Sequence, residues 1–297
     1  MHPRLPLSLK AALLASCIFC PFITSASVSD GSLGNVMYVG DSITHGINSG
    51  SYRWALHKIF ADNGISYSAA GINTGNYSGG VAAGISYGGR VFNNAHSSQA
   101  SARAYEIAGR ADGANYGRFN GSNINNWLGL STEKTKGGTY TGQTFTGTAA
   151  PGTFFILAGN LMAGGGISRL STVTQNLLGD MDSIVGAMKT ANSNAEIIVL
   201  SIPCWTQHSN GNSNATHQAV ADYNESLKNW GRDKDGVTVI DVNQGIIDVA
   251  SSTPFYGVRS MFNNPAGDGL HPNAQGDLLM AGNLAKGMGY AGRSAGQ

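Results

Sequence analysis

The chain alternates short apolar runs typical of strands with longer runs typical of amphipathic helices, and this alternation is what most constrains its fold. Five apolar runs predict strands at 36–39, 65–70, 153–157, 196–202 and 237–242. Apolar residues at helical spacing predict helices at 51–63, 122–128, 170–191, around 220–230 and at 273–288, with a short one at 97–110. Strands that alternate with helices favour a parallel sheet covered on both faces. We therefore expect an α/β fold, a three-layer α/β/α sandwich with a central, mostly parallel five-stranded sheet.

Two segments interrupt the alternation. Residues 71–95 are rich in Gly, Asn, Ser and Tyr and have no helical period, so they predict a long surface loop. Residues 131–152 are rich in Thr and Gly together with residues that favour strands, which predicts a hairpin excursion. Since no interdomain linker and no internal repeat is visible, residues 27–297 are expected to form a single domain.

The first 26 residues form a separate unit. Arg4 and Lys10 precede an apolar stretch at 11–23, and small residues follow at 24–26. This order of basic, apolar and small residues predicts a cleaved secretory signal peptide over 1–26. The mature protein is then expected to be secreted or periplasmic, in a bacterial-type cell.

A lipid anchor is the alternative to simple cleavage. Residues 14–17, Leu-Ala-Ser-Cys, resemble a bacterial lipobox that would leave a lipidated Cys17. The apolar run continues to Ile23, beyond the cut that a lipobox implies, and this favours ordinary secretion. No other segment is long and apolar enough to span a membrane, so insertion is not expected unless Cys17 is lipidated.

Charge and motif content exclude several classes of partner. Eighteen basic and seventeen acidic residues give a formal net charge of +1, without a basic block of the kind that tracks phosphates. Nucleic acid is therefore not an expected partner. His208 and His217 are too loosely spaced for a metal site, and no Gly-rich segment combines with a strand, helix and acid to bind a dinucleotide. We expect neither a metal nor an organic cofactor.

A serine stands directly after the first predicted strand, in the segment Gly40-Asp41-Ser42-Ile43-Thr44. The carboxyl ends of parallel strands carry the chemistry of such sheets, so Ser42 is placed where a nucleophile should be. Serine is also common as the N-cap of a helix. The pentapeptide alone leaves both interpretations open.

A candidate base lies near the end of the chain, in Asp268-Gly269-Leu270-His271-Pro272. A serine hydroxyl becomes a good nucleophile when a base takes its proton, and a carboxylate commonly orients that base. Asp268, three residues before His271, can reach it across a single turn. On its own the segment is equally typical of a solvated Asp followed by a His-Pro helix start.

An amide follows the strand predicted at 153–157. Asn160 is a candidate donor to the oxyanion of a tetrahedral intermediate, because its amide stands near a strand end. Asn and Gly also turn or cap chains routinely. This role depends on the other two motifs lying nearby.

Together these motifs resemble the SGNH branch of the GDSL hydrolases, over essentially the whole mature chain. The resemblance implies a flavodoxin-like SGNH hydrolase fold, with Ser42 as nucleophile, His271 as base and Asp268 as its orienting acid. It also implies an oxyanion hole made by the Ser42 backbone N–H, the Asn160 amide and a backbone N–H from a second block.

The sequence departs from this family at two of its blocks. The third block normally has the form Gly-x-Asn-Asp, whereas here it is Ala158-Gly159-Asn160-Leu161, which keeps only the Asn. For the second block, residues 94–99 resemble the His-Ser-Gly stretch of carbohydrate esterases in this group, with Ser98 where the Gly stands. Gly79 and Gly80 are alternatives for that donor.

Four other side chains are possible contributors. His45 either lines the pocket or lies at the surface of a helix start, and His96 either shapes the second oxyanion loop or caps a helix. Trp205 and His208 follow the fourth strand and are candidates for substrate binding, although packing explains Trp205 equally well.

The sequence thus predicts a secreted serine esterase that hydrolyses short acyl esters, most specifically acetyl esters, on carbohydrate through an acyl-enzyme. The expected partner is an acylated carbohydrate or another small ester. A lipase or thioesterase of the same fold is one alternative. A noncatalytic carbohydrate-binding protein on a decayed hydrolase scaffold is another, motivated by the altered third block.

Overall fold

The computed structural model describes residues 31–47, 51–76, 80–110, 119–142, 150–158, 170–203, 213–244 and 271–290. The main strands are β1 (Ser32–Gly40), β2 (Ser66–Ala70), β6 (Ala95–Ser98), β7 (Thr153–Leu157), β8 (Glu196–Leu200) and β9 (Val237–Ile240). Three two-residue strands are β3 (Asn73–Thr74), β4 (Ser86–Tyr87) and β5 (Arg90–Val91). The helices are α1 (Ser42–His45), α2 (Ser51–Asp62), α3 (Ala104–Ala108), α4 (Ile124–Trp127), α5 (Leu170–Ala191), α6 (Ser213–Arg232) and α7 (Ala274–Gly287).

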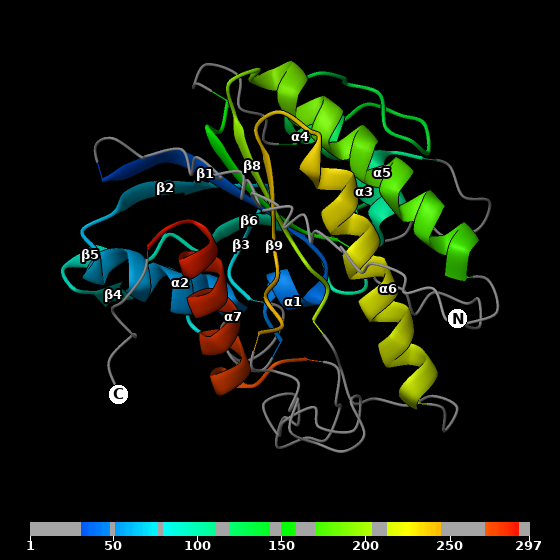
Figure 1. Cartoon of the computed structure of the whole chain (residues 1–297). Coiled ribbons are helices and arrows are strands. Elements are labelled where there is room, and N and C mark those ends of the chain that lie inside the picture. Colours follow the sequence, from blue (N-terminus) through cyan, green and yellow to red (C-terminus); the bar gives the residue numbers. More distant parts are fainter. Residues whose placement is uncertain are drawn as a thin grey trace, which may run out of the picture.

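The central sheet is parallel through β1, β7, β8 and β9, and one edge of β1 is shared by two strands in succession (Figure 1). The β2 strand pairs with the first part of β1, up to Met37 opposite Ala70. The β6 strand then pairs with the end of β1, where Gly40 lies opposite Ser98. The five predicted strands are all present, and the mainly parallel sheet is confirmed. The sheet has seven strands because β6 and the antiparallel β3 are added at this edge.

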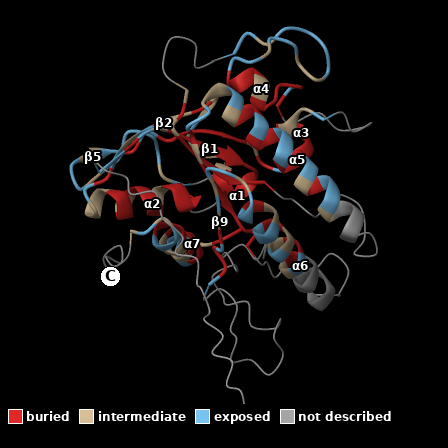
Figure 2. Cartoon of the chain, turned by 45° about the horizontal axis from the view of Figure 1, so that its top comes forward, coloured by how far each residue is buried: buried red, intermediate tan, exposed pale blue. Residues whose placement is uncertain are grey.

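Helices cover both faces of the sheet (Figures 1 and 2). Alternate residues of each strand point to opposite faces, so Phe154 and Ile156 of β7 face one core and Phe155 and Leu157 face the other. The first core is closed by α3, α4, α5 and α6, and the second by α2 and α7. The predicted three layers are therefore observed.

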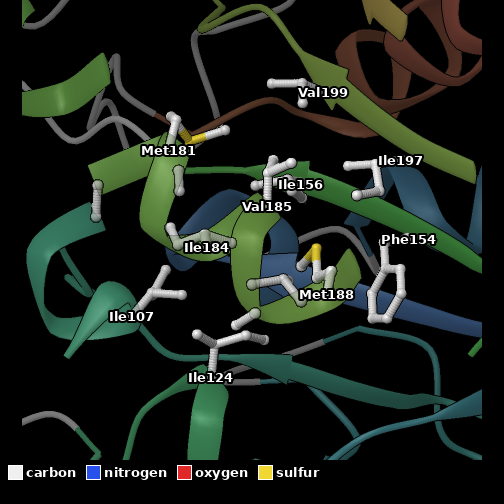
Figure 3. Packing of buried hydrophobic residues seen from close by; sticks show 14 of the residues in the cluster. Ile107, Ile124, Phe154, Ile156, Met181, Ile184, Val185, Met188, Ile197 and Val199 are labelled. Carbon is white, nitrogen blue, oxygen red and sulfur yellow. The ribbon is translucent and has the colours of Figure 1, made fainter. Parts of the chain in front are cut away.

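The core beneath α5 shows how the helical period is satisfied (Figure 3). Met181, Ile184 and Met188 recur at spacings of three and four and are fully buried against the sheet. Each such side chain stabilises the fold by about 1.5–3 kcal/mol through removal of apolar area from water. The strength of this period explains why the prediction of a helix at 170–191 matches the observed bounds of α5.

The segment 71–95 is not the plain surface loop that was expected. It contains β3, a hairpin of β4 and β5, and the start of β6. Gly71 is required where this segment leaves the sheet, because a Cβ there would overlap the backbone of His96. The sequence did not indicate β3, β4 and β5 because each has two residues, which is too short for an alternating pattern to show.

Two further segments can be compared with their predictions. The short helix expected at 97–110 is observed only as α3, after β6 has ended. In the described part of the 131–152 segment, Glu133 and Thr139 form an isolated antiparallel bridge, while residues 143–149 lie outside the described ranges.

Candidate active site

Ser42 lies on a tight one-turn helix at the carboxyl end of β1. The N-cap of α1 is Asp41, whose carboxylate accepts the N–H of Ile43 at 3.0 Å, so Ser42 is the first helical residue and not the cap. Gly40 permits this turn, since a Cβ there would overlap the carbonyl oxygen of Leu157 and the side chain of Thr44. The carboxyl end of β1 and the turn that follows it therefore fix the direction in which the Ser42 hydroxyl points.

The Ser42 hydroxyl meets the imidazole of His271. The Ser42 Oγ atom lies 2.9 Å from His271 Nε2, and the two residues are 8% and 9% exposed. The residues are 229 positions apart in the chain. His271 is brought to the site just ahead of α7, whose N-cap is Asn273. This geometry allows the imidazole to take a proton from the hydroxyl.

The backbone N–H of Ser42 lies at the first position of α1. Within the described residues it donates to no protein acceptor, whereas the N–H of Asp41 donates to the carbonyl of Leu157 and that of Ile43 to Asp41. An N–H of the nucleophile's own residue is suited to hold a developing oxyanion.

A buried arginine donates hydrogen bonds to carbonyl groups of the turn that carries Ser42. Arg53 on α2 is fully buried and donates from Nε to the carbonyl of Thr44 at 2.7 Å and from Nη2 to the carbonyl of His45 at 3.2 Å. Its Nη1 atom donates to the side chain of Asn94. No carboxylate in the described part of the chain forms an ion pair with it. Burial lowers the pKa of Arg53 to about 10, so it remains charged at neutral pH.

The expected second-block residue Ser98 is buried at the end of β6, beside Gly40. Its backbone N–H donates to His96 Nδ1 at 3.2 Å, and its hydroxyl lies 2.6 Å from the same atom. The N–H proposed for the oxyanion is thus engaged within its own strand in this structure. The alternative Gly80 is exposed in the excursion, and Gly79 lies outside the described residues.

Several predicted site residues fall outside the described ranges. These are Asp268, Asn160, Trp205, His208 and Cys17. Their predicted roles remain predictions. The structure brings together Ser42, His271 and Ser98 near the ends of β1 and β6.

Asp41 is an acid in an unusual environment. Its burial raises the pKa of the carboxyl to about 7, although backbone hydrogen bonds from Ile43 and Thr44 act in the opposite direction. The folded protein therefore binds a proton at pH values where the unfolded chain has released it. The residue was known from the sequence only as part of the motif around Ser42.

This acid should leave a signature in the pH dependence of stability. Below about pH 4 the carboxyl is protonated in both states, and between pH 4 and 7 only the folded state holds the proton. The contribution of Asp41 to the free energy of unfolding should therefore fall as pH rises through this window, by up to about 4 kcal/mol at 1.36 kcal/mol per pH unit. The lowered pKa values of His45, His57 and His96 contribute with the opposite sign, so the contribution of Asp41 is the difference between wild type and Asp41→Asn. Asp41→Asn keeps a good N-cap and should remove this slope. Urea denaturation of wild type and Asp41→Asn from pH 4 to 8 gives the free energy of unfolding of each protein. If the two plots of this free energy against pH run parallel, the prediction is wrong.

Sequence analysis did not single out Arg53, Asn94 or Asp41 as contributors to the site. A charged or amide side chain inside an otherwise apolar helix or loop is the only signal they carry, and it does not reveal which carbonyl groups the side chain meets.

The described residues contain no cluster of three or more His, Cys, Asp or Glu side chains that could hold a metal. None of the helices in the described ranges has the length and apolar character needed to cross a membrane.

Comparison with known proteins agrees with this geometry. A model of the GDSL-like Lipase/Acylhydrolase family matches residues 38–279, from β1 to within α7. The chain belongs to this family. It is accordingly a carboxylic ester hydrolase, and the resemblance drawn from Ser42, Asp268 and His271 led to the correct family. A search of curated proteins found no match.

Several solved structures share the fold of this GDSL-like acylhydrolase. A carbohydrate esterase family 3 protein from Talaromyces cellulolyticus superposes with a TM-score of 0.55 at 18% identity, over 85% of this chain and 94% of that one. A family 3 carbohydrate esterase from Clostridium thermocellum gives 0.51 at 18% identity, over 86% and 94%. A mutant acetyl esterase with an acetate ion gives 0.52 at 18% identity, over 85% and 94%. At this identity the likeness establishes the shared fold.

Proposed function

We propose that this GDSL-like acylhydrolase is an exported serine esterase that removes short acyl groups, most specifically acetyl, from carbohydrate. The observation that carries the proposal is the 2.9 Å contact between Ser42 Oγ and His271 Nε2. A hydroxyl paired with an imidazole at this distance is the arrangement needed for nucleophilic attack on an ester.

The proposed reaction passes through an acyl-enzyme. Ser42 Oγ attacks the acyl carbon while His271 Nε2 takes its proton, and the same proton is then passed to the leaving alcohol. Water attacks the acyl-enzyme with His271 again as base, which releases the acid and restores Ser42. Asp268 is proposed to orient His271. The N–H groups of Ser42 and Ser98 and the Asn160 amide are proposed to hold the oxyanion, and the Ser98 N–H would then leave His96 Nδ1 when substrate binds.

The composition of the segments expected near the site favours a polar substrate. Residues 71–95 and 131–152 are rich in Gly, Asn, Ser, Thr and Tyr, although the β4–β5 hairpin packs at the carboxyl end of α2 and exposes Ile85 and Val91. A long-chain lipase needs an extended apolar trough. Two of the similar structures are described as carbohydrate esterases and one as an acetyl esterase. Trp205 and His208 are proposed to contact the sugar.

The expected substrate preference is testable with two aryl esters. The kcat/KM for an aryl acetate should exceed that for the aryl octanoate by about tenfold or more, because a polar site does not reward added methylenes. Acetate release from acetylated xylan, pectin and sialylated mucin then identifies the glycan. A preference for octanoate, with no acetate released from any glycan, would assign the chain as a lipase or thioesterase.

The altered third block favours one rival, a noncatalytic binding protein on the same scaffold. A fluorophosphonate probe separates the two functions, because only an active site will be modified covalently at Ser42. Peptide mass spectrometry of the labelled mature chain locates the modification. Absence of label at Ser42 would reject the esterase.

Export is proposed from residues 1–26 and not from the described fold. A cleaved signal peptide would place a domain of residues 27–297 in the periplasm or medium, whereas a lipobox would leave Cys17 lipidated. The mass of the exported protein's N-terminal peptide distinguishes these outcomes, and a retained residue 1 would contradict both.

A further inference from the structure

Two imidazole rings that take no part in the proposed proton transfer lie against each other beside Ser42. His45 is the last residue of α1, and His96 lies in β6. The centroids of the two rings are 4.9 Å apart, with their planes tilted by 50°. His96 is fully buried, and His45 is half-buried.

The tautomer of His96 follows from its hydrogen bonds. Its Nε2 atom lies 2.8 Å from the carbonyl oxygen of Gly75, which can only accept, so the proton is on Nε2. The Nδ1 lone pair is then free to accept the N–H and the hydroxyl of Ser98. Burial, together with the nearby charge of Arg53, holds the pKa of His96 well below its usual range. The ring is therefore a neutral acceptor that fixes Ser98.

His45 also accepts a backbone N–H, but from the segment that follows β6. Its Nδ1 atom accepts the N–H of Ala100 at 3.2 Å. The backbone N–H of His45 donates to the carbonyl of Asp41 at 2.8 Å, so its ring is carried by the same helical turn as Ser42. Burial lowers the pKa of His45 to about 4, and the charge of Arg53 acts in the same direction. One neutral imidazole thus joins the nucleophile turn to the segment that follows β6.

The segment after β6 needs such support because it contains a strained turn. The N–H of Gln99 donates to the carbonyl of Gly40 at 3.2 Å. The N–H of Ala102 donates to the carbonyl of Gln99 at 3.0 Å, which closes the turn. Ser101 within it has a φ of 61°, a left-handed conformation that is costly for a residue with a Cβ. Strain of this kind persists only where surrounding contacts impose it.

We propose that His45, assisted by His96, is a positioning residue that holds the turn Ser98–Ala102 against Ser42 as one wall of the oxyanion site. The inference rests on the proposed function, since it assigns a partner to the proposed nucleophile. A wall fixed before substrate arrives keeps the reacting groups aligned, and a displacement of about 1 Å can cost about 10²-fold in rate. His45 itself touches neither substrate nor the reacting proton.

Substitutions at His45 separate the acceptor from the ring. His45→Leu removes the acceptor and should lower kcat on aryl acetate by about 10- to 100-fold, with KM little changed. His45→Asn places an amide oxygen near the Nδ1 position and should recover most of kcat, whereas the longer His45→Gln should not. The matched control is His57→Leu on α2. This substitution removes the imidazole hydrogen bonds to the Tyr67 hydroxyl and the Arg90 carbonyl, as His45→Leu removes the one to Ala100. His57 lies on the side of α2 that faces the β4–β5 hairpin.

The outcomes are distinct. An unchanged kcat in a folded His45→Leu would overturn the inference, as would equal impairment of the Asn and Gln variants. A loss of thermal stability equal to that of His57→Leu, with kcat intact, would also overturn it. If His45→Leu does not fold, the comparison of Asn with Gln decides. Failure of the wild-type protein to be labelled at Ser42 by a fluorophosphonate would instead reject the proposed function.

Discussion

Replacement of Ser42 by alanine should reduce kcat by about 10³-fold or more while the protein remains folded. The hydroxyl of Ser42 is the protein group that bonds to the acyl carbon in the proposed reaction, so its loss removes the acyl-enzyme route. The fold should tolerate the change, because it removes the hydrogen bond between Ser42 and His271, and one such bond contributes about 1 kcal/mol. Steady-state hydrolysis of an aryl acetate, with circular dichroism as the check on folding, measures the effect.

The matched control for Ser42→Ala is Ser201→Ala at the end of β8. Ser201 is also buried, and its hydroxyl donates to Asp241 at 2.9 Å and accepts from the N–H of Val242 and from Asn243 Nδ2 at 3.0 Å each. The control therefore loses a hydroxyl and more hydrogen bonds than Ser42→Ala does, which makes it a stringent check on folding. It should retain most of kcat because it lies two strands away from β1 in the sheet. A folded Ser42→Ala protein that keeps more than about a tenth of the wild-type kcat would remove Ser42 from the role of nucleophile.

The layers of the fold were predictable because their signals are local. Strands β1, β7 and β8 and helix α5 carry apolar residues that are buried as their periods require, whereas β2 and β9 are only partly buried. The pairing of Ser42 with a residue 229 positions away was predictable in another way. It followed from two short motifs that belong to one family, and no periodicity in the chain indicates it.

The supporting parts of the site could not be predicted because their signals are tertiary. His96 and Ser98 belong to a strand that has no apolar pattern. This strand, β6, forms because β2 leaves the end of β1 unpaired on one side. Arg53 lies on the buried face of α2, where its charge meets carbonyl oxygens of α1. A sequence shows that such a residue is polar, but not that the fold brings acceptors to it.

Removal of the base should be nearly as damaging as removal of the nucleophile. In His271→Ala the Ser42 hydroxyl loses its proton acceptor, so kcat should fall by about 10³-fold or more. Asp268→Asn should be less damaging, because it removes the orientation of the ring and not the base itself. Both variants are compared with wild type on aryl acetate.

A contribution from His271 through packing alone must be distinguished from its role as base. His271 is buried, so its loss could also lower the thermal stability of the protein. His271→Gln retains a polar side chain of similar reach, and it should be as inactive as His271→Ala because an amide cannot take a proton at neutral pH. Fluorophosphonate labelling at Ser42 should slow in both variants, since the attack on phosphorus needs the same base. Wild-type activity or wild-type labelling rates in a folded His271→Ala protein would show that Ser42 is activated by another group.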